Sequence, residues 1–113
     1  DDAARDLLER TRVEGTVTPW GIPVDGAVVV NATPIGMGEE ALPGAVLTHA
    51  SGLFDLTYGP IESPAVGFVR DLGLPVATGK DLLIAQAAAS FEIWTGVPAP
   101  VDVMRDAFSA PPE

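Results

Sequence analysis

The sequence lacks cysteine altogether and contains a single histidine and a single lysine. Without cysteine the chain can form neither disulfide bonds nor thiolate metal sites, a composition that fits a cytoplasmic protein. No apolar run reaches the roughly 18 residues that a membrane-spanning helix needs. The acidic start, Asp1-Asp2, is the opposite of the basic region that opens a secretory signal. We therefore expect a cytoplasmic protein without a membrane segment.

Basic residues are also scarce. Six lysines and arginines stand against 16 aspartates and glutamates, which gives a formal net charge of −10. Such a surface repels phosphate backbones and anionic lipids, so we expect no nucleic-acid partner and no membrane partner. The rest of the composition permits a folded core, because 47% of the 113 residues are hydrophobic. At this length the chain forms one domain at most.

One stretch combines an apolar run with an abrupt polar end. Val28-Val29-Val30 are three β-branched residues in a row, which indicates a strand buried on both faces, as in parallel sheets. The loop from Asn31 to Met37 then supplies an amide, a hydroxyl, a proline and a glycine. In open α/β sheets, ligands bind in such loops, outside the carboxyl ends of the strands. A buried strand followed by an ordinary turn is the alternative for this segment alone.

Periodicity and helix-stop signals predict an alternating α/β order for the chain. The expected elements are a helix from Asp1 or Asp2 to Arg12, strands at 16–18, 27–31, 53–57 and 74–77, a helix between the cap Ser63 and the stop Gly73, helices at 81–94 and 102–108, and a frayed tail at 110–113. The helix at 81–94 is apolar almost all round, so we expect it to be buried.

The predicted order places three polar loops together. Parallel strands joined by right-handed crossovers suit this sequence of elements. The loops at 31–37, 55–59 and 78–81 each follow a predicted strand. Because the carboxyl ends of parallel strands meet at one edge of the sheet, we expect polar residues from all three loops to converge there.

These loops resemble the C-terminal, cofactor-binding domain of the shikimate dehydrogenase family. Four motifs carry the resemblance, namely Asn31-Ala32-Thr33-Pro34-Ile35-Gly36-Met37, Asp55-Leu56-Thr57-Tyr58 with Pro60 and Pro64, Gly79-Lys80-Asp81-Leu82-Leu83-Ile84-Ala85-Gln86-Ala87-Ala88, and Phe91-Glu92-Ile93-Trp94-Thr95-Gly96. The resemblance covers roughly Val28 to Met104. It implies an α/β, partial Rossmann-like three-layer domain over residues 1–113, with a parallel sheet that lacks its first strand and its Gly-rich loop, and without the substrate domain.

The resemblance also implies roles for individual residues. Positions beside the nicotinamide half of the cofactor are matched by Asn31, Ala32, Thr33, Leu56, Gly79 and Leu82, whereas positions that contact a hydroxy-acid substrate are matched by Tyr58 and Gln86. A glutamine in a buried helix needs a partner, because an unpaired buried amide costs about 1–3 kcal/mol. A substrate group or a neighbouring loop carbonyl would serve Gln86. No residue matches a catalytic or metal-binding position.

The sequence departs from the family pattern in two ways. Where the family often has Gly-Leu-Gly-Met, this chain has Gly79-Lys80-Asp81-Leu82; we expect Asp81 to cap the helix and Lys80 not to be a catalytic base. The Gly-rich loop that binds a pyrophosphate at a helix N-terminus is missing, and so are the family's catalytic lysine and aspartate. NADP is the implied cofactor. An acid at Asp1-Asp2, where the adenosine ribose would lie, keeps NAD open.

The leading hypothesis is a fragment of a shikimate dehydrogenase-like oxidoreductase of aromatic amino-acid biosynthesis, which reduces 3-dehydroshikimate to shikimate with NADP. In that scheme the chain supplies the nicotinamide-side wall and is inactive alone, and an upstream portion or a second copy covers its sheet. The alternative is a non-catalytic module of the same fold that binds a small metabolite or a partner. A hydrolase that uses His49 is the third hypothesis, although His49 is expected in a surface loop.

Overall fold

The computed structural model of the chain describes residues 2–59 and 61–109. Three of the sequence-based expectations concern residues outside these ranges. They are the capping role of Asp1, the place of Pro60 in the second motif, and the frayed tail at 110–113.

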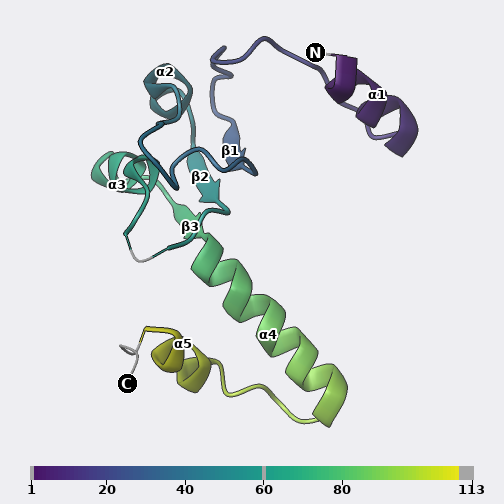
Figure 1. Ribbon diagram of the computed structural model, residues 1–113, viewed down its shortest axis with the longest axis vertical. Coiled ribbons are helices and arrows are strands. Elements are labelled where there is room, and N and C mark those ends of the chain that lie inside the picture. Colours follow the sequence, from purple (N-terminus) through teal and green to yellow (C-terminus); the bar gives the residue numbers. More distant parts are fainter. Residues whose placement is uncertain (1, 60, 110–113) are drawn as a thin grey trace.

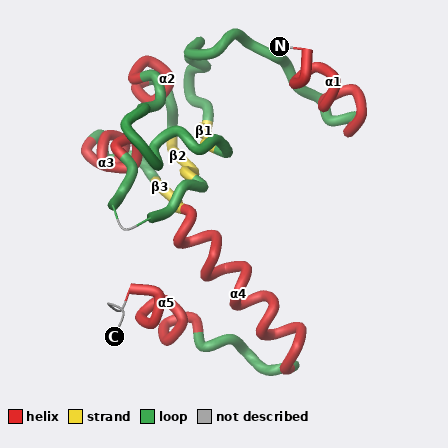
Figure 2. Tube along the Cα trace, in the orientation of Figure 1, coloured by secondary structure: helices red, strands yellow, loops and turns green. Residues whose placement is uncertain are grey.

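A parallel sheet of three strands forms the centre of the fold (Figures 1 and 2). The strands are β1 (Val28–Asn31), β2 (Gly52–Asp55) and β3 (Val76–Thr78), in the order β1-β2-β3. The last residues of the strands lie side by side, because Asn31 pairs with Asp55 and Asp55 pairs with Thr78. The predicted α/β class and the parallel sheet are confirmed.

Two helices cover one face of this sheet. They are α2 (Gly44–Thr48) and α3 (Pro64–Asp71), which Figure 1 shows on the same side. The core between them and the strands consists of Leu47, Leu53, Ala65, Val66 and Val69. The start of α3 is as predicted, with Pro64 at its first turn and the Ser63 hydroxyl accepting a hydrogen bond from the Val66 N–H.

The other face of the sheet is open, which corrects the expectation that β1 is buried on both faces. Val28 is 65% exposed and Val30 is 56% exposed. Helix α1 (Asp2–Thr11) stands away from the sheet at the end of the extended segment 12–27 (Figure 1). Residues 16–18 of that segment form no strand, contrary to the prediction. No helix in the described part of the chain therefore shields Val28 and Val30 from solvent.

The last two helices project from the carboxyl edge of the sheet. Helix α4 (Gly79–Thr95) points away from the strands, and α5 (Val101–Ser109) folds back beside it (Figures 1 and 2). The expectation that the 81–94 helix is buried all round is wrong, because Ile93 is 81% exposed and Trp94 is 82% exposed. Only Gly79, Ile84 and Ala88 of α4 are buried.

Several element boundaries also differ from the predictions. Helix α2 was not predicted, and His49 follows directly after it as its C-terminal cap. Strand β2 ends at Asp55 and β3 lies at 76–78, so the sheet ends in polar residues. Helix α5 begins at Val101, which places Asp102 inside its first turn and not at the cap.

Candidate functional site

Polar side chains meet where the three strands end, as the order of elements predicted. Asn31 ends β1, Asp55 ends β2 and Thr78 ends β3. Asn31 is 2% exposed and Asp55 is completely buried. Buried polar groups at this density need internal partners, and the loops provide them.

Asp55 is the centre of the resulting hydrogen-bond network. Its Oδ1 accepts from Asn31 Nδ2 at 3.1 Å, from the Thr57 N–H at 3.0 Å and from the Thr57 hydroxyl at 2.7 Å. Its Oδ2 accepts from the Ser63 hydroxyl at 2.7 Å. One carboxyl group thereby connects β1, the loop after β2 and the N-terminus of α3. The sequence placed Asp55 in a family motif and Ser63 at a helix cap, but it indicated no role for either residue in the site.

The first loop is folded around the side chain of Asn31. Its Oδ1 accepts from the Thr33 hydroxyl at 2.6 Å and from the Thr33 N–H at 3.1 Å, and its Nδ2 donates to the Ile35 carbonyl at 2.9 Å. Gly36 follows with φ +106°, and a Cβ there would lie 3.2 Å from Ser63 Cβ. The loop needs glycine at this position because the backbone is left-handed and α3 is close.

The third loop contains the tightest backbone contact of the site. A Cβ at Gly79 would lie 2.4 Å from the Leu56 carbonyl oxygen and 2.8 Å from that of Thr57, so only glycine fits. Thr78 is the N-cap of α4, and Asp81 completes a capping box with it. Asp81 was expected to be the cap itself. It is instead the third residue of the helix, with its Oδ2 accepting from the Thr78 N–H at 2.9 Å.

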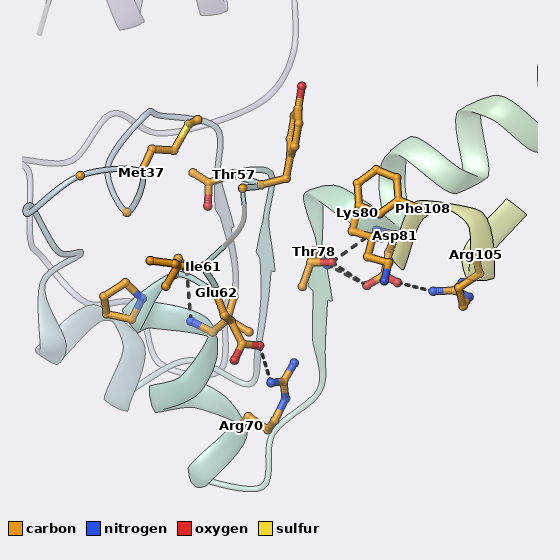
Figure 3. Close-up of a pocket in the computed structure, with 17 residues that line it drawn as sticks. Met37, Thr57, Ile61, Glu62, Arg70, Thr78, Lys80, Asp81, Arg105 and Phe108 are labelled. Carbon is orange, nitrogen blue, oxygen red and sulfur yellow. Dashed lines mark hydrogen bonds and ion pairs between the residues drawn. The ribbon is translucent and has the colours of Figure 1, made fainter. Parts of the chain in front are cut away.

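A cavity of about 700 Å³ lies between these loops, α3 and α5 (Figure 3). Half of the chain's six basic residues line it, in a chain of net charge −10. Arg70 is paired with Glu62, and Arg105 is paired with Asp81 at 3.0 Å. Lys80 lies over the Phe108 ring, 5.4 Å from its centroid, and donates to the Ser109 hydroxyl. Of these three cations, Lys80 is the one that has no carboxylate partner among residues 2–59 and 61–109.

The charges of the cavity affect one carboxyl group clearly. The pKa of Asp81 lies below its ordinary value of 3.8, chiefly because Arg105 donates a hydrogen bond to it and secondly because the Thr78 N–H does so. Its side chain remains 41% exposed, so the pair with Arg105 is screened by solvent. Asp81 is therefore held in its ionised form at the start of α4.

Residues 2–59 and 61–109 contain no group of three or more His, Asp or Glu side chains that could hold a metal ion. The same ranges include no helix that is both long enough and apolar enough to cross a membrane.

Comparison with known proteins identifies the relatives of this arrangement. A family model described as the Shikimate 5'-dehydrogenase C-terminal domain matches residues 79–107. A curated shikimate dehydrogenase (NADP(+)) from Methanocella arvoryzae is 46% identical over 113 residues, which cover 90% of this chain and 41% of the relative. Its counterpart from Archaeoglobus fulgidus is 42% identical over 119 residues, covering 95% of this chain and 44% of the relative.

Solved structures of shikimate dehydrogenases are also similar to this chain. A chorismate mutase/shikimate 5-dehydrogenase fusion protein from Clostridium acetobutylicum is 32% identical with a TM-score of 0.64, covering 75% of this chain and 34% of that protein. A shikimate dehydrogenase solved in complex with NADP+ is 28% identical with a TM-score of 0.57, covering 72% of this chain and 30% of that protein. This chain belongs to the shikimate dehydrogenase family. It spans about two fifths of the length of the curated relatives it matches.

The structure brings together some of the residues that the shikimate dehydrogenase resemblance selected. Tyr58 lines the cavity and is 59% exposed. Gly79 is buried against the half-buried Leu56, and Leu82 is half-buried in the first turns of α4. None of these three lines the cavity, although their chain neighbours Thr57, Thr78 and Asp81 do. Their assigned contacts with a cofactor or a substrate stay predictions.

The other selected residues lie apart from this cavity. Asn31 and Thr33 line a second pocket of about 200 Å³ beside Trp20, and Ala32 is exposed. Gln86 is exposed on α4 and does not line the cavity, so the premise that it is a buried amide in need of a partner is wrong. The reason is that its face of α4 has no cover in the described part of the chain.

The cavity also contains residues that sequence reasoning missed. Arg70, Arg105 and Phe108 reach it from α3 and α5. The only available signal was their rarity, because arginine and aromatic side chains stand out in an acidic chain with 6% aromatic residues. His49 lies elsewhere. It is 2.5 Å from Asp25 (Nδ1 to Oδ1) and precedes β2, at the amino ends of the strands.

Proposed function

We propose that this chain forms the nicotinamide-side wall of an NADP-dependent oxidoreductase that interconverts 3-dehydroshikimate and shikimate. The observation that carries the proposal is the fixed meeting of three loops at the carboxyl edge of the sheet, in a chain whose relatives are named shikimate dehydrogenase (NADP(+)). The activity belongs to the longer protein. A cytoplasmic location is part of the proposal, as expected for an enzyme that uses NADP in biosynthesis.

The cofactor would supply the hydride, and the protein would orient it. A volume of about 700 Å³ fits a small ligand or one end of a dinucleotide. Gly79, Leu56 and Leu82 do not line this cavity themselves, but they would shape the wall beside the nicotinamide through their cavity-lining neighbours Thr57, Thr78 and Asp81, with the backbone of the first loop next to them. The described residues include no Gly-rich turn of the kind that holds a pyrophosphate, so the phosphates would be bound by residues outside this chain.

Tyr58 would hydrogen-bond a cyclic hydroxy acid in the same cavity. Its side chain is 59% exposed, so removal of the hydroxyl should not weaken the fold. In the full-length protein we expect Tyr58→Phe to raise the KM for shikimate about tenfold, which corresponds to one hydrogen bond of about 1.4 kcal/mol. Thr48→Val, which also removes one exposed hydroxyl, is the matched control and should leave the KM unchanged. Equal values for both variants would exclude the assigned role of Tyr58.

The central test is an absorbance assay of NADP+-dependent oxidation of shikimate by the full-length protein. Activity with NADP+ supports the proposal, whereas binding of NADP+ without any turnover supports a non-catalytic module of the same fold. Comparison of KM values for NADP+ and NAD+ decides the cofactor. We also propose that the 113-residue chain alone is inactive, because no residue in it matches the family's acid/base pair. Turnover by the isolated chain would contradict this division of roles.

The open face of the sheet also belongs to the proposal. Val28 and Val30 present apolar side chains to solvent, and such faces are normally covered. We propose that the preceding part of the full-length protein covers them, with a second copy of the chain as the alternative. Light scattering of the full-length protein distinguishes these two covers. A monomer excludes the second copy and leaves the preceding part of the protein, whereas a dimer that Val30→Glu dissociates supports the second copy.

A further inference from the structure

Three side-chain contacts attach α5 to the first turn of α4. Arg105 Nη1 donates to Asp81 Oδ1 at 3.0 Å, Lys80 Nζ donates to the Ser109 hydroxyl, and the same ammonium lies over the Phe108 ring. Figure 3 shows Phe108 beside Lys80 and Arg105 next to Asp81. We call these contacts, made by Lys80, Asp81, Arg105, Phe108 and Ser109, the α5 latch. Its two α4 residues, Lys80 and Asp81, are two of the three positions at which this chain differs from the family's Gly-Leu-Gly-Met pattern.

The latch is connected directly to the loop that precedes α4. The two oxygens of Asp81 have different partners: Oδ1 accepts from Arg105, and Oδ2 accepts from the Thr78 N–H at 2.9 Å and from its hydroxyl at 3.1 Å. A movement of α5 that pulls on Oδ1 therefore also acts on the cap of α4. Charge-assisted hydrogen bonds of this kind are stronger than neutral ones and have defined geometry.

The cap is in turn packed against the loop after β2. Gly79, the residue after Thr78, approaches the Leu56 carbonyl so closely that a Cβ would lie 2.4 Å from its oxygen. A shift of the cap therefore moves Thr78, which lines the cavity, and acts through Gly79 on the backbone of Leu56 and Thr57, of which Thr57 also lines the cavity. On the other side, Phe108 and Arg105 line the same cavity. The position of α5 thus affects two parts of the cavity lining. It places Arg105 and Phe108 directly, and it acts through the α4 cap on Thr57 and Thr78.

We propose that Arg105 is a positioning residue, which acts through Asp81 to hold the Thr78–Gly79 turn in the conformation that accepts the nicotinamide end of the cofactor. The inference rests on the proposed function, because it assigns that ligand to the cavity. Arg105 itself need not touch the ligand. Loss of the latch weakens cofactor binding, and it leaves the chemical step unchanged because the chemical groups are elsewhere.

The experiment compares three variants of the full-length protein. Arg105→Gln removes the charge and Arg105→Lys retains it, whereas Arg10→Gln is the matched control, since Arg10 is also an exposed helical arginine paired with a carboxylate, at 3.6 Å from Asp6. We expect Arg105→Gln to raise the KM for NADP+ about fivefold with kcat within about twofold, the scale of one ion pair. Arg105→Lys restores most of the affinity, and Arg10→Gln changes nothing.

Two further measurements separate the possible failures. Hydrogen exchange of residues 101–109 should accelerate in Arg105→Gln and not in Arg10→Gln, which shows whether the latch holds α5. Titration of NADPH fluorescence gives affinity independently of turnover. Faster exchange with unchanged NADPH affinity overturns the positioning role and leaves the proposed function intact. Failure of the unmodified full-length protein to bind NADPH overturns both. Equal loss of kcat and affinity also overturns the inference, because it indicates a general structural defect.

Discussion

Replacement of Asp55 by alanine tests whether the carboxyl edge is held together by one side chain. Asp55 is completely buried and accepts four hydrogen bonds from Asn31, Thr57 and Ser63. Asp55→Ala removes all four acceptor contacts. The hydroxyls of Thr57 and Ser63 can rotate toward other acceptors, but the Thr57 N–H and one Asn31 amide hydrogen are fixed by the backbone and by the loop.

The magnitude follows from those two fixed donors. A buried donor left without a partner costs about 1–3 kcal/mol, so we expect a loss of about 2–6 kcal/mol in the free energy of unfolding. That is a large share of the roughly 5–15 kcal/mol that stabilises a typical domain. With a denaturant slope of about 2 kcal/mol per molar urea, the midpoint should fall by roughly 1–3 M.

Urea denaturation of the full-length protein, followed by circular dichroism, measures this shift. Asp71→Ala is the matched control, because Asp71 is exposed at the C-terminal end of α3. Its midpoint should change by less than the equivalent of about 0.5 kcal/mol. If Asp55→Ala behaves like Asp71→Ala, the hydrogen bonds at Asp55 contribute no net stability and the account of the carboxyl edge is refuted.

Two more predictions concern the start of α4. Gly79→Ala should lower the thermal midpoint of unfolding by several degrees, because overpacking against Leu56 costs about 1–3 kcal/mol. Gly67→Ala in α3 is the control. A Cβ there meets nothing within 4 Å, so this change should be neutral or stabilising. Because the pKa of Asp81 is lowered in the folded protein, its pair with Arg105 contributes stability above pH 3.8 and loses it as the pH falls through the folded-state pKa. The protection of α5 amides against hydrogen exchange, relative to the intrinsic exchange rate at each pH, should therefore decrease as the pH falls below 3.8, and Arg105→Gln should abolish this pH dependence.

Local signals in the sequence placed the three strands of the sheet and α3, but they also predicted a strand at 16–18 that does not form, and they missed α2. The three parallel strands were placed by short apolar runs that end in polar residues, and α3 by Ser63, Pro64 and Gly73. These signals act within a few residues, so they operate in any context. The convergence of three loops followed from chain direction alone, because parallel strands must end at the same edge.

Burial could not be predicted in the same way. Val28, Val30, Ile93 and Trp94 are apolar and exposed, although their sequences are typical of buried strands and helices. An apolar pattern shows that a face requires a partner, but not that the partner lies within the same 113 residues. The expected burial of Gln86 was wrong for this reason, since it followed from the expected burial of α4, and the substrate contact assigned to Gln86 stays a prediction.

The polar residues at the carboxyl edge divide into two groups that sequence alone could not separate. Asn31, Asp55 and Ser63 direct their side chains at one another, and this mutual satisfaction fixes the loops. Tyr58 and Lys80 line the cavity, and within residues 2–59 and 61–109 neither side chain has a carboxylate or amide partner. Both groups consist of polar residues at the ends of strands or in the segments after them, so their local sequence does not separate them. The two groups differ in whether the fold brings a polar partner close to the side chain. Asn31 and Asp55, for example, are 24 positions apart in the chain and form a hydrogen bond in the structure. A ligand at this edge would therefore meet a preformed framework, and its recognition would depend on the side chains that the framework leaves unused.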